Sequence, residues 1–291
     1  MSEQVVITNG DLTATISTLG AELQSLTDSA GREYMTDGDP AFWSGRAPIL
    51  FPIVGGLNGG TYRHQGREYQ LPRHGFARRS EFACYRHGTD SAVFTLADNA
   101  ETRASYPFGF KLSLAFAISG SRLVIGAAIT NRGDEPMPAG FGYHPAFAWP
   151  LPGGGEKLQH TIEFAQDEPA DVRRLDADGL VAFSEPTPLD GRSLALSPDL
   201  FEGDAIIWDK LQSRSLVYRS PQGPALKIEF ENLPYLGVWQ KPGASFICIE
   251  PWAGLADDAG FAGDIAQKRG IFMLAPGATR HFPMAITVLE R

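Results

Sequence analysis

The chain has 291 residues, of which 43% are hydrophobic and 20% charged, and its formal net charge is −9. This composition is typical of a globular protein and excludes a disordered one, and the acidic balance argues against partners such as nucleic acid or an anionic membrane surface. The 32 glycines and 21 prolines make up about 18% of the chain, against roughly 12% on average, which favours many short strands over long helices.

Apolar residues alternate with polar or small ones along much of the chain, as in strands that place one face on a core. In chain order this pattern predicts strands at Leu12–Ile16, Ala92–Leu96, Phe110–Ile118, Leu123–Ile129, Leu216–Arg219, Leu226–Phe230 and Phe282–Val288. The tetrapeptide Ser119-Gly120-Ser121-Arg122 separates two of them and predicts a β-hairpin. Phe246–Ile249 is uniformly apolar and predicts a strand buried on both faces, whereas Pro198–Trp208 and Phe261–Lys268 are expected to hold a helical turn or two each.

These elements predict an all-β fold, with residues 1–291 forming one large two-layered antiparallel β-sandwich. No run approaches the roughly 18 apolar residues of a membrane span, and the first ten residues lack a basic segment followed by an apolar one. We therefore expect a cytoplasmic protein without a membrane partner. The cysteines Cys84 and Cys248 are too few for a disulfide framework and are expected to be buried thiols.

Three segments place ionisable residues among glycine, proline and aromatic residues: Leu71–Arg78, Gly140–Phe147 and Phe246–Gly254. Their ionisable residues include His74, His144 and Glu250, whose apolar neighbours would partly desolvate them and move their pKa values toward neutrality. Because Glu250 follows an apolar strand and precedes a proline, we expect it where the strand leaves the sheet, either paired with an arginine or used in chemistry. The remaining histidines, His64, His87, His160 and His281, are expected to be structural.

Several standard sites are missing from the sequence. There is no phosphate-binding P-loop, no dinucleotide fingerprint, no nucleophile elbow and no HExxH or paired CxxC spacing. A metal site would therefore need ligands from distant segments, such as His74, His144 and Glu250.

Four motifs together resemble the aldose 1-epimerase (galactose mutarotase-like) family, and most closely its LacX-like branch. They are Arg46-Ala-Pro-Ile-Leu-Phe-Pro, Pro72-Arg-His-Gly-Phe-Ala-Arg, Gly142-Tyr-His-Pro-Ala-Phe and Cys248-Ile-Glu-Pro-Trp-Ala-Gly. The resemblance extends to Phe201-Glu-Gly-Asp-Ala-Ile, Val238-Trp-Gln-Lys-Pro and Leu274-Ala-Pro-Gly, so it spans nearly the whole chain.

This resemblance implies a sugar site on the concave face of the sandwich. It also implies an isomerase of the mutarotase type, which interconverts the α and β anomers of a hexose or hexose 6-phosphate by acid–base ring opening, without a metal or other cofactor. Carried over by motif, Glu250 is expected to be the base, His144 the acid and His74 a hydrogen-bonding group near the ring oxygen. Arg46, Asp204 and Trp252 are expected at the sugar, with Asp209 close enough in sequence to be an alternative to Asp204.

Four arginines, Arg46, Arg73, Arg78 and Arg79, concentrate positive charge beside the expected site. We expect Arg73 and Arg79 to pair with local acids, while Arg46 and Arg78 have the fork geometry that suits a phosphate. The partner is then a small-molecule sugar or sugar phosphate, and the chain is expected to be a monomer or homodimer. The alternative function is a non-catalytic carbohydrate-binding protein on the same fold, with Trp252, Trp239, Phe76 and Phe147 as stacking surfaces.

Overall fold

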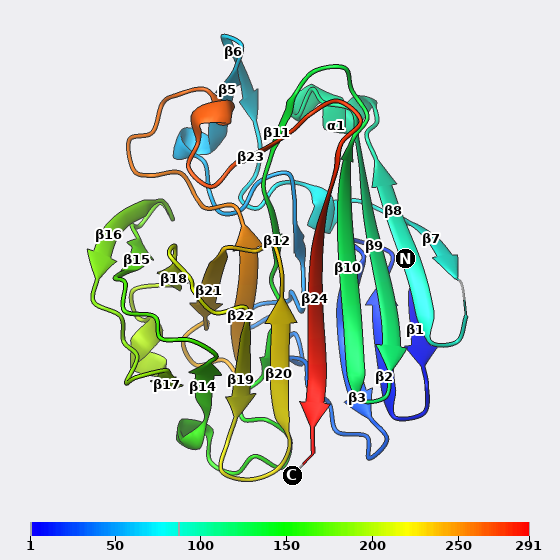
Figure 1. Ribbon diagram of the computed structural model, residues 1–291, viewed down its shortest axis with the longest axis vertical. Helices are drawn as coiled ribbons and strands as arrows, with labels where there is room; N and C mark the ends of the chain where they lie inside the picture. The colour runs from blue at the N-terminus through cyan, green and yellow to red at the C-terminus, as the bar shows by residue number, and fades with distance from the viewer. Residues whose placement is uncertain (1, 87, 291) are drawn as a thin grey trace.

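The computed structural model describes residues 2–86 and 88–290, and two large antiparallel sheets packed face to face form most of it (Figure 1). Among these residues the larger sheet has nine strands, in the spatial order β17 (Ser193–Ala195), β14 (Thr161–Phe164), β19 (Ser215–Arg219), β20 (Ala225–Phe230), β24 (Thr279–Leu289), β10 (Arg122–Asn131), β9 (Phe110–Ser119), β8 (Ser91–Ala97) and β7 (Ala83–Arg86). The prediction of a large antiparallel β-sandwich is confirmed.

The second sheet carries most of the residues predicted to be functional. Its order in the described part of the chain is β16 (Val181–Glu185), β15 (Val172–Leu175), β18 (Ile206–Trp208), β21 (Tyr235–Trp239), β22 (Phe246–Ala253), β12 (Phe141–Tyr143) and β4 (Ile49–Leu50), with β13 (Ala146–Ala148) also paired to β22. Each pair of adjacent strands is antiparallel.

Smaller elements lie around the two sheets. They are a sheet of β1 (Gln4–Thr8), β2 (Leu12–Ser17) and β3 (Glu22–Asp28), the hairpin of β5 (Thr61–His64) and β6 (Arg67–Gln70), and the pair β11 (Met137–Ala139) and β23 (Phe272–Leu274). The remaining elements are the α-helix α1 (Ala100–Ser105) and short 3₁₀ turns at Asn58–Gly60, Ala77–Arg79, Lys157–Gln159, Pro198–Phe201 and Ile265–Gln267. No helix in the described residues has the length and apolar character needed to cross a bilayer.

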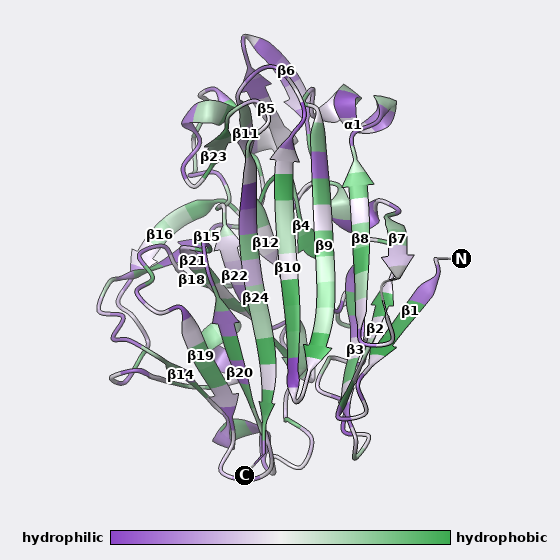
Figure 2. Ribbon diagram, turned by 45° about the vertical axis from the view of Figure 1, so that its right-hand side comes forward, coloured by the Kyte–Doolittle hydropathy of each residue, from purple (hydrophilic) through white to green (hydrophobic). Residues whose placement is uncertain are grey.

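The core lies between the two sheets and follows from the alternation in the sequence. β9 and β10 form the predicted hairpin, and their buried residues alternate with more exposed ones along both strands. Figure 2 shows the apolar residues along β8, β9 and β10. Aromatic rings join the two layers, since Phe282 of β24 stacks on Phe141 of β12 with centroids 4.9 Å apart.

Tyr143 fixes the end of β12 to the opposite sheet. Its hydroxyl donates to the carbonyl of Phe282 (2.6 Å) and accepts from the amide of Ala127 (3.1 Å). Because Tyr143 points into the core, the next residue, His144, is directed toward the other face of the second sheet.

The helical predictions are only partly confirmed. Phe261–Lys268 holds the short turn Ile265–Gln267, but Pro198–Trp208 holds a turn only at its start and ends in strand β18. The end of this segment is extended because a strand lets Ile206 and Trp208 both point into the core while it pairs with β21. Helix α1 was not predicted, although its Asn99–Thr102 capping box is a sequence signal.

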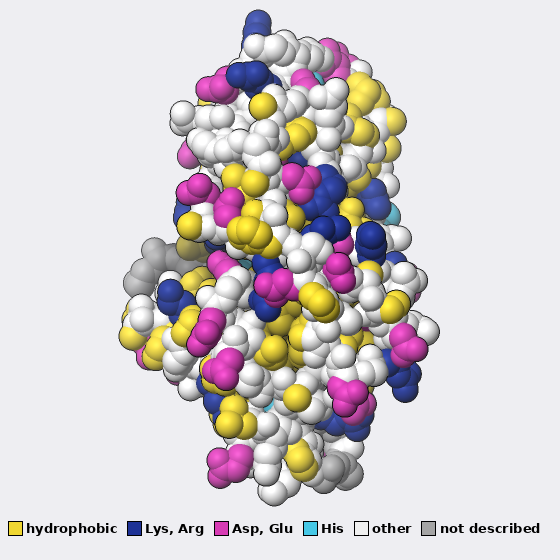
Figure 3. Space-filling model, turned by 90° about the vertical axis from the view of Figure 1, so that its left-hand side faces the viewer, with side chains coloured by type: hydrophobic (Ala, Val, Ile, Leu, Met, Phe, Trp, Pro, Cys, Tyr) yellow, Lys and Arg dark blue, Asp and Glu magenta, His cyan; other side chains and the backbone are white. Residues whose placement is uncertain are grey.

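One side of the molecule shows how its surface charge is distributed. On the face in Figure 3, Lys and Arg side chains are interspersed with Asp and Glu, without a broad patch of one sign. That face therefore lacks the continuous basic surface that nucleic acid requires.

Candidate active site

A cavity of about 200 Å³ lies on the face of the second sheet that points away from the main core. Wider grooves occur near His64 and near Phe183, but the predicted site residues gather in this smaller one. Its polar and aromatic lining residues are Trp43, Arg73, His74, Arg78, His144, Asp204, Trp239, Glu250 and Trp252.

Strand β22 presents Glu250 to this cavity. Cys248, Glu250 and Trp252 alternate with Ile247 and Ile249, which lie in the main core. The expectation that the strand ends at Glu250 is wrong, because β22 continues through Pro251 to Ala253.

Pro251 is tolerated because the neighbouring strand is interrupted beside it. β22 pairs with β13 up to Cys248 and with β12 from Trp252 onward. The segment that connects β12 to β13 contains His144 and pairs with neither end of β22 in a regular ladder. The amide of Ile249 donates to the carbonyl of Pro145 (3.1 Å), so the missing N–H of Pro251 would point to the same interrupted side. The same interruption brings His144 beside Glu250.

The two residues form a buried acid–base pair. His144 Nε2 lies 3.1 Å from Glu250 Oε2, and their exposed fractions are 8% and 1%. Burial, and then the charge of Asp204, raises the pKa of the Glu250 carboxyl well above its ordinary value. Burial also lowers the pKa of the His144 imidazole to about 3. Both shifts favour neutral side chains, which places the proton of the pair on the Glu250 carboxyl and leaves the His144 imidazole uncharged.

His74 is held in a single tautomer by the backbone. Its Nδ1 accepts the amide proton of Gly55 (3.1 Å), so a neutral ring carries its proton on Nε2. Burial, followed by the nearby His144 and Arg78, lowers the pKa of His74 well below its ordinary value. The ring lies 5.7 Å from that of His144, nearly perpendicular to it. His74 is therefore a neutral hydrogen-bond donor beside the acid–base pair.

The glycine that follows His74 is required by the local backbone. Gly75 has φ 71°, and a Cβ at this position would lie 2.2 Å from the carbonyl oxygen of Phe51. The His-Gly dipeptide of the sequence motif thus allows the loop to pass close to Phe51 and to carry His74 to the cavity.

Two arginines line the cavity without a carboxylate partner in the described part of the chain. The Arg78 guanidinium donates to the carbonyl of Arg73 (3.1 Å), and its Nε is buried without a hydrogen-bond partner among the residues that the structure describes. Arg73 donates to the carbonyl of Asp178 (3.0 Å). Within residues 2–86 and 88–290, no acid lies within 4 Å of either guanidinium or of Arg79, so the expected pairing of Arg73 and Arg79 with local acids is not found.

The structure places Arg46 outside the cavity lining. Its guanidinium donates to the backbone carbonyls of Gln24 (3.2 Å), Thr36 (2.5 Å) and Asp37. These bonds fix the loop that precedes β4, which includes Trp43. Arg46 therefore supports the cavity wall rather than facing the cavity.

The two candidate aspartates are separated clearly. Asp204 lines the cavity, whereas Asp209, whose side chain is 5% exposed, lies further along the sheet between Arg173 (2.8 Å) and Arg269 (2.7 Å). The ion pairs occupy Asp209, which leaves Asp204 as the aspartate available to a ligand.

Three tryptophans shape the cavity. Trp43 lies 4.9 Å from the ring of His144 and meets Trp239 edge to face at 5.7 Å. Trp252 lies over Gly237, where a Cβ would come within 2.4 Å of the indole. Trp43 was not predicted, because it lies in an irregular loop without a periodic pattern. Of the other expected stacking residues, Phe147 is in the main core and Phe76 packs against it.

The other histidines lie outside this cavity's lining. His160 Nε2 accepts from the amide of Leu151 (3.0 Å), His64 lies 3.8 Å from Asp264, and His281 is exposed. His87 lies outside the described residues.

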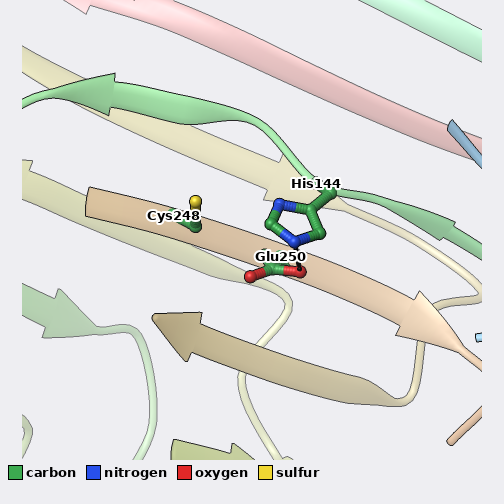
Figure 4. A group of neighbouring side chains, drawn as sticks. All are labelled: His144, Cys248 and Glu250. Carbon is green, nitrogen blue, oxygen red and sulfur yellow. Dashed lines mark ion pairs between the residues drawn. The ribbon is translucent and has the colours of Figure 1, made fainter. Parts of the chain in front are cut away.

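One group of potential metal ligands adjoins the cavity: His144, Cys248 and Glu250 (Figure 4). It differs from the predicted set because Cys248 takes the place of His74. Cys248 is fully buried as expected, whereas Cys84 is only partly buried, because it lies on the edge strand β7.

Comparisons with known proteins agree with this geometry. The family model for aldose 1-epimerase matches residues 3–270. The LacX protein of Lactococcus lactis is 33% identical over 98% of this chain and 99% of its own length, and the uncharacterized protein YphB of Escherichia coli is 31% identical over 82% of each.

A solved structure described as a galactose mutarotase related enzyme from Lactobacillus acidophilus superposes with a TM-score of 0.92 at 32% identity, covering 98% of this chain and 97% of that one. A galactose mutarotase-like protein from Lactobacillus casei gives 0.91 at 30% identity, covering 98% and 100%. The sequence motifs, the sandwich and the family match lead to one conclusion: the chain belongs to the aldose 1-epimerase family.

Proposed function

We propose that this protein is a mutarotase that interconverts the α and β anomers of a hexose or hexose 6-phosphate. The observation that carries the proposal is the buried contact between His144 and Glu250 in a cavity that also offers Asp204 and three tryptophans. A cavity of about 200 Å³ is smaller than the roughly 300–1,000 Å³ of sites for drug-sized ligands, which suits a single sugar.

The reaction needs one proton removed and one supplied. We assign Glu250 as the base that takes the proton from the C1 hydroxyl while the C1–O5 bond breaks and C1 becomes an aldehyde. His144 gives a proton to the departing ring oxygen, and His74 Nε2–H donates a hydrogen bond near that oxygen. After rotation about the C1–C2 bond, the reverse transfers close the ring on the other face of the aldehyde and restore both groups.

The contact between the two groups supports this assignment. Because the two groups lie 3.1 Å apart, the proton of the Glu250 carboxyl can pass to His144 when the sugar binds. The transfer leaves a carboxylate that can accept the C1 proton and an imidazolium that can protonate the ring oxygen, without water in the cavity. A purely sugar-binding protein gains nothing from a buried carboxyl–imidazole pair, whose desolvation is costly.

For the substrate, we propose that Arg73 and Arg78 bind a phosphate group of the sugar. Both guanidinium groups line the cavity, and neither forms an ion pair with a described acid, so their positive charge is available to an anion. Free hexose remains the alternative substrate, since its hydroxyls can also accept from these groups.

The replacement Glu250→Gln tests the reaction. The amide preserves the shape of the side chain but cannot accept the C1 proton, so we expect mutarotation to fall by at least about 100-fold. The measurement is the polarimetric rate for freshly dissolved α-glucose, α-galactose and glucose 6-phosphate, after subtraction of the spontaneous rate.

The matched control is Glu229→Gln, which changes a carboxylate on β20 away from the cavity and should retain wild-type turnover. Near-full activity of folded Glu250→Gln would refute the assignment of the base. Sugar binding by wild type without faster mutarotation of any of the three sugars would favour the non-catalytic alternative.

A further inference from the structure

Cys248 has no part in the proton transfers proposed above, yet it lies beside both groups that carry them. One ligand atom from each of His144, Cys248 and Glu250 lies within 4.8 Å of the other two. Figure 4 shows Cys248 and Glu250 on β22, with His144 reaching them from the neighbouring segment. All three side chains are buried.

Two polar atoms of this group are available for an additional ligand. His144 Nδ1 and Glu250 Oε2 are both buried without a hydrogen-bond partner among the described residues. Glu250 Oε2 lies 3.1 Å from His144 Nε2 but forms no hydrogen bond with it. Such atoms are rare in folded proteins, because leaving a buried polar group without a partner destabilises the fold.

The spacing of the three atoms is close to that of a metal site. Three atoms that lie within 4.8 Å of one another share a point no more than about 2.8 Å from each of them. Zinc binds histidine nitrogen and carboxylate oxygen at about 2.0–2.2 Å and cysteine sulfur at about 2.3 Å. Each ligand atom therefore needs to move inward by less than about 1 Å.

The charges and donor types also fit one class of ion. A thiolate and a carboxylate together neutralise a divalent cation, so the occupied site would carry no net charge in its buried surroundings. A set of nitrogen, sulfur and oxygen donors favours zinc and similar borderline-soft ions over magnesium and calcium, which take oxygen ligands.

We propose that His144, Cys248 and Glu250 form an inhibitory site for Zn²⁺ and chemically similar divalent ions, which bind in competition with the sugar. On binding, the thiol proton and any proton held by Glu250 pass to water, and the ion occupies the base and the acid. Metal binding stands on the geometry alone, whereas its inhibitory effect rests on the proposed mutarotase activity.

Cobalt spectroscopy tests metal binding without reference to activity. Co²⁺ replaces Zn²⁺ in such sites, and its bond to a thiolate gives a near-ultraviolet charge-transfer band. The chain has two cysteines, so in the variant Cys84→Ala any thiolate–cobalt band must come from Cys248. We expect the band at one equivalent of Co²⁺ in wild type and in Cys84→Ala, and its loss in Cys248→Ala.

Inhibition is then measured with Zn²⁺ and with Mg²⁺ as the control ion. Zn²⁺ should raise the KM of wild type for the sugar, whereas Mg²⁺ should have no effect. Loss of a residue that only hydrogen-bonds to a metal ligand weakens metal binding by about 10–100-fold. Cys248 is a direct ligand in the proposed site, so Cys248→Ala should raise the inhibition constant for Zn²⁺ at least about tenfold. Its turnover without metal should match that of wild type, as should that of Cys84→Ala.

The outcomes separate the two proposals. A cobalt band in Cys84→Ala, together with a lack of mutarotation of every sugar tested, would support the metal site and refute the proposed function. Active enzyme without a cobalt band would refute the metal site and leave the function intact. Zn²⁺ inhibition of equal strength in wild type and Cys248→Ala would also refute the proposed ligand set. If Cys248→Ala does not fold, the band in Cys84→Ala still decides whether Cys248 binds the ion.

Discussion

Replacing Arg78 with alanine should separate phosphorylated from free sugars. Arg78 lines the cavity, its guanidinium has no described carboxylate partner, and its Nε is buried without a hydrogen-bond partner. Charge-assisted hydrogen bonds contribute roughly 1.5–3 kcal/mol, which corresponds to a rise of about 10–150-fold in the KM for glucose 6-phosphate. The phosphate is remote from C1, so it is bound equally in the ground and transition states, and kcat should change little.

The assay is polarimetry of glucose 6-phosphate and free glucose with wild type, Arg78→Ala, Arg78→Lys and Arg79→Ala. Arg79 is the matched control, because it is the adjacent arginine but is exposed and does not line the cavity. Arg78→Lys keeps the charge without the planar fork and should fall between wild type and Arg78→Ala. Added salt should weaken the phosphorylated substrate more than free glucose.

Arg78 also donates one hydrogen bond to the Arg73 carbonyl, so the thermal stability of each variant is measured in parallel. An equal loss of activity toward both sugars would mean that Arg78 supports the His74 loop instead of binding phosphate. A wild-type preference for the free sugar would refute the phosphate proposal directly.

Two further predictions concern the walls of the cavity and the loop behind it. Trp43→Ala should raise the KM for the sugar about 2–12-fold, because it removes an aromatic contact of roughly 0.5–1.5 kcal/mol. The control is Phe42→Ala, which changes the adjacent exposed residue and should leave the KM unchanged. Equal KM values for the two variants would contradict this role of Trp43. Lys268→Met leaves the buried Asp257 without its partner at 2.6 Å and should lower the free energy of unfolding by about 3–5 kcal/mol in urea denaturation. In contrast, Lys227→Met breaks the more exposed pair with Glu229 and should lower the free energy of unfolding by less than about 1 kcal/mol. Similar decreases in the two lysine variants would refute the argument that burial makes the Lys268–Asp257 pair the more important one.

The sequence by itself predicted the class of fold and the main functional residues. Alternation along Phe110–Ile118 and Leu123–Ile129 defined the central hairpin, because a strand with one face on a core must repeat every two residues. His74, His144 and Glu250 stood out because they interrupt apolar segments at positions flanked by glycine or proline, and all three line one cavity. Their catalytic roles remain predictions.

Local signals misled where the neighbouring chain decides the conformation. Pro251 predicted the end of a strand, but the break between β12 and β13 leaves its missing N–H without a required partner, so β22 continues. Pro198–Trp208 was expected to hold a helical turn or two. It holds one at Pro198–Phe201, and pairing with β21 makes its end, Ile206–Trp208, a strand.

Only the tertiary structure decided which charged and aromatic residues share the cavity. It placed Trp43 and Arg73 there, kept Arg46 in the supporting loop, and chose Asp204 over Asp209, whose carboxylate is held between two arginines. These choices depend on which strands and loops lie side by side. That order is set by the packing of the whole core, whereas the period of a single strand determines only which of its residues face inward.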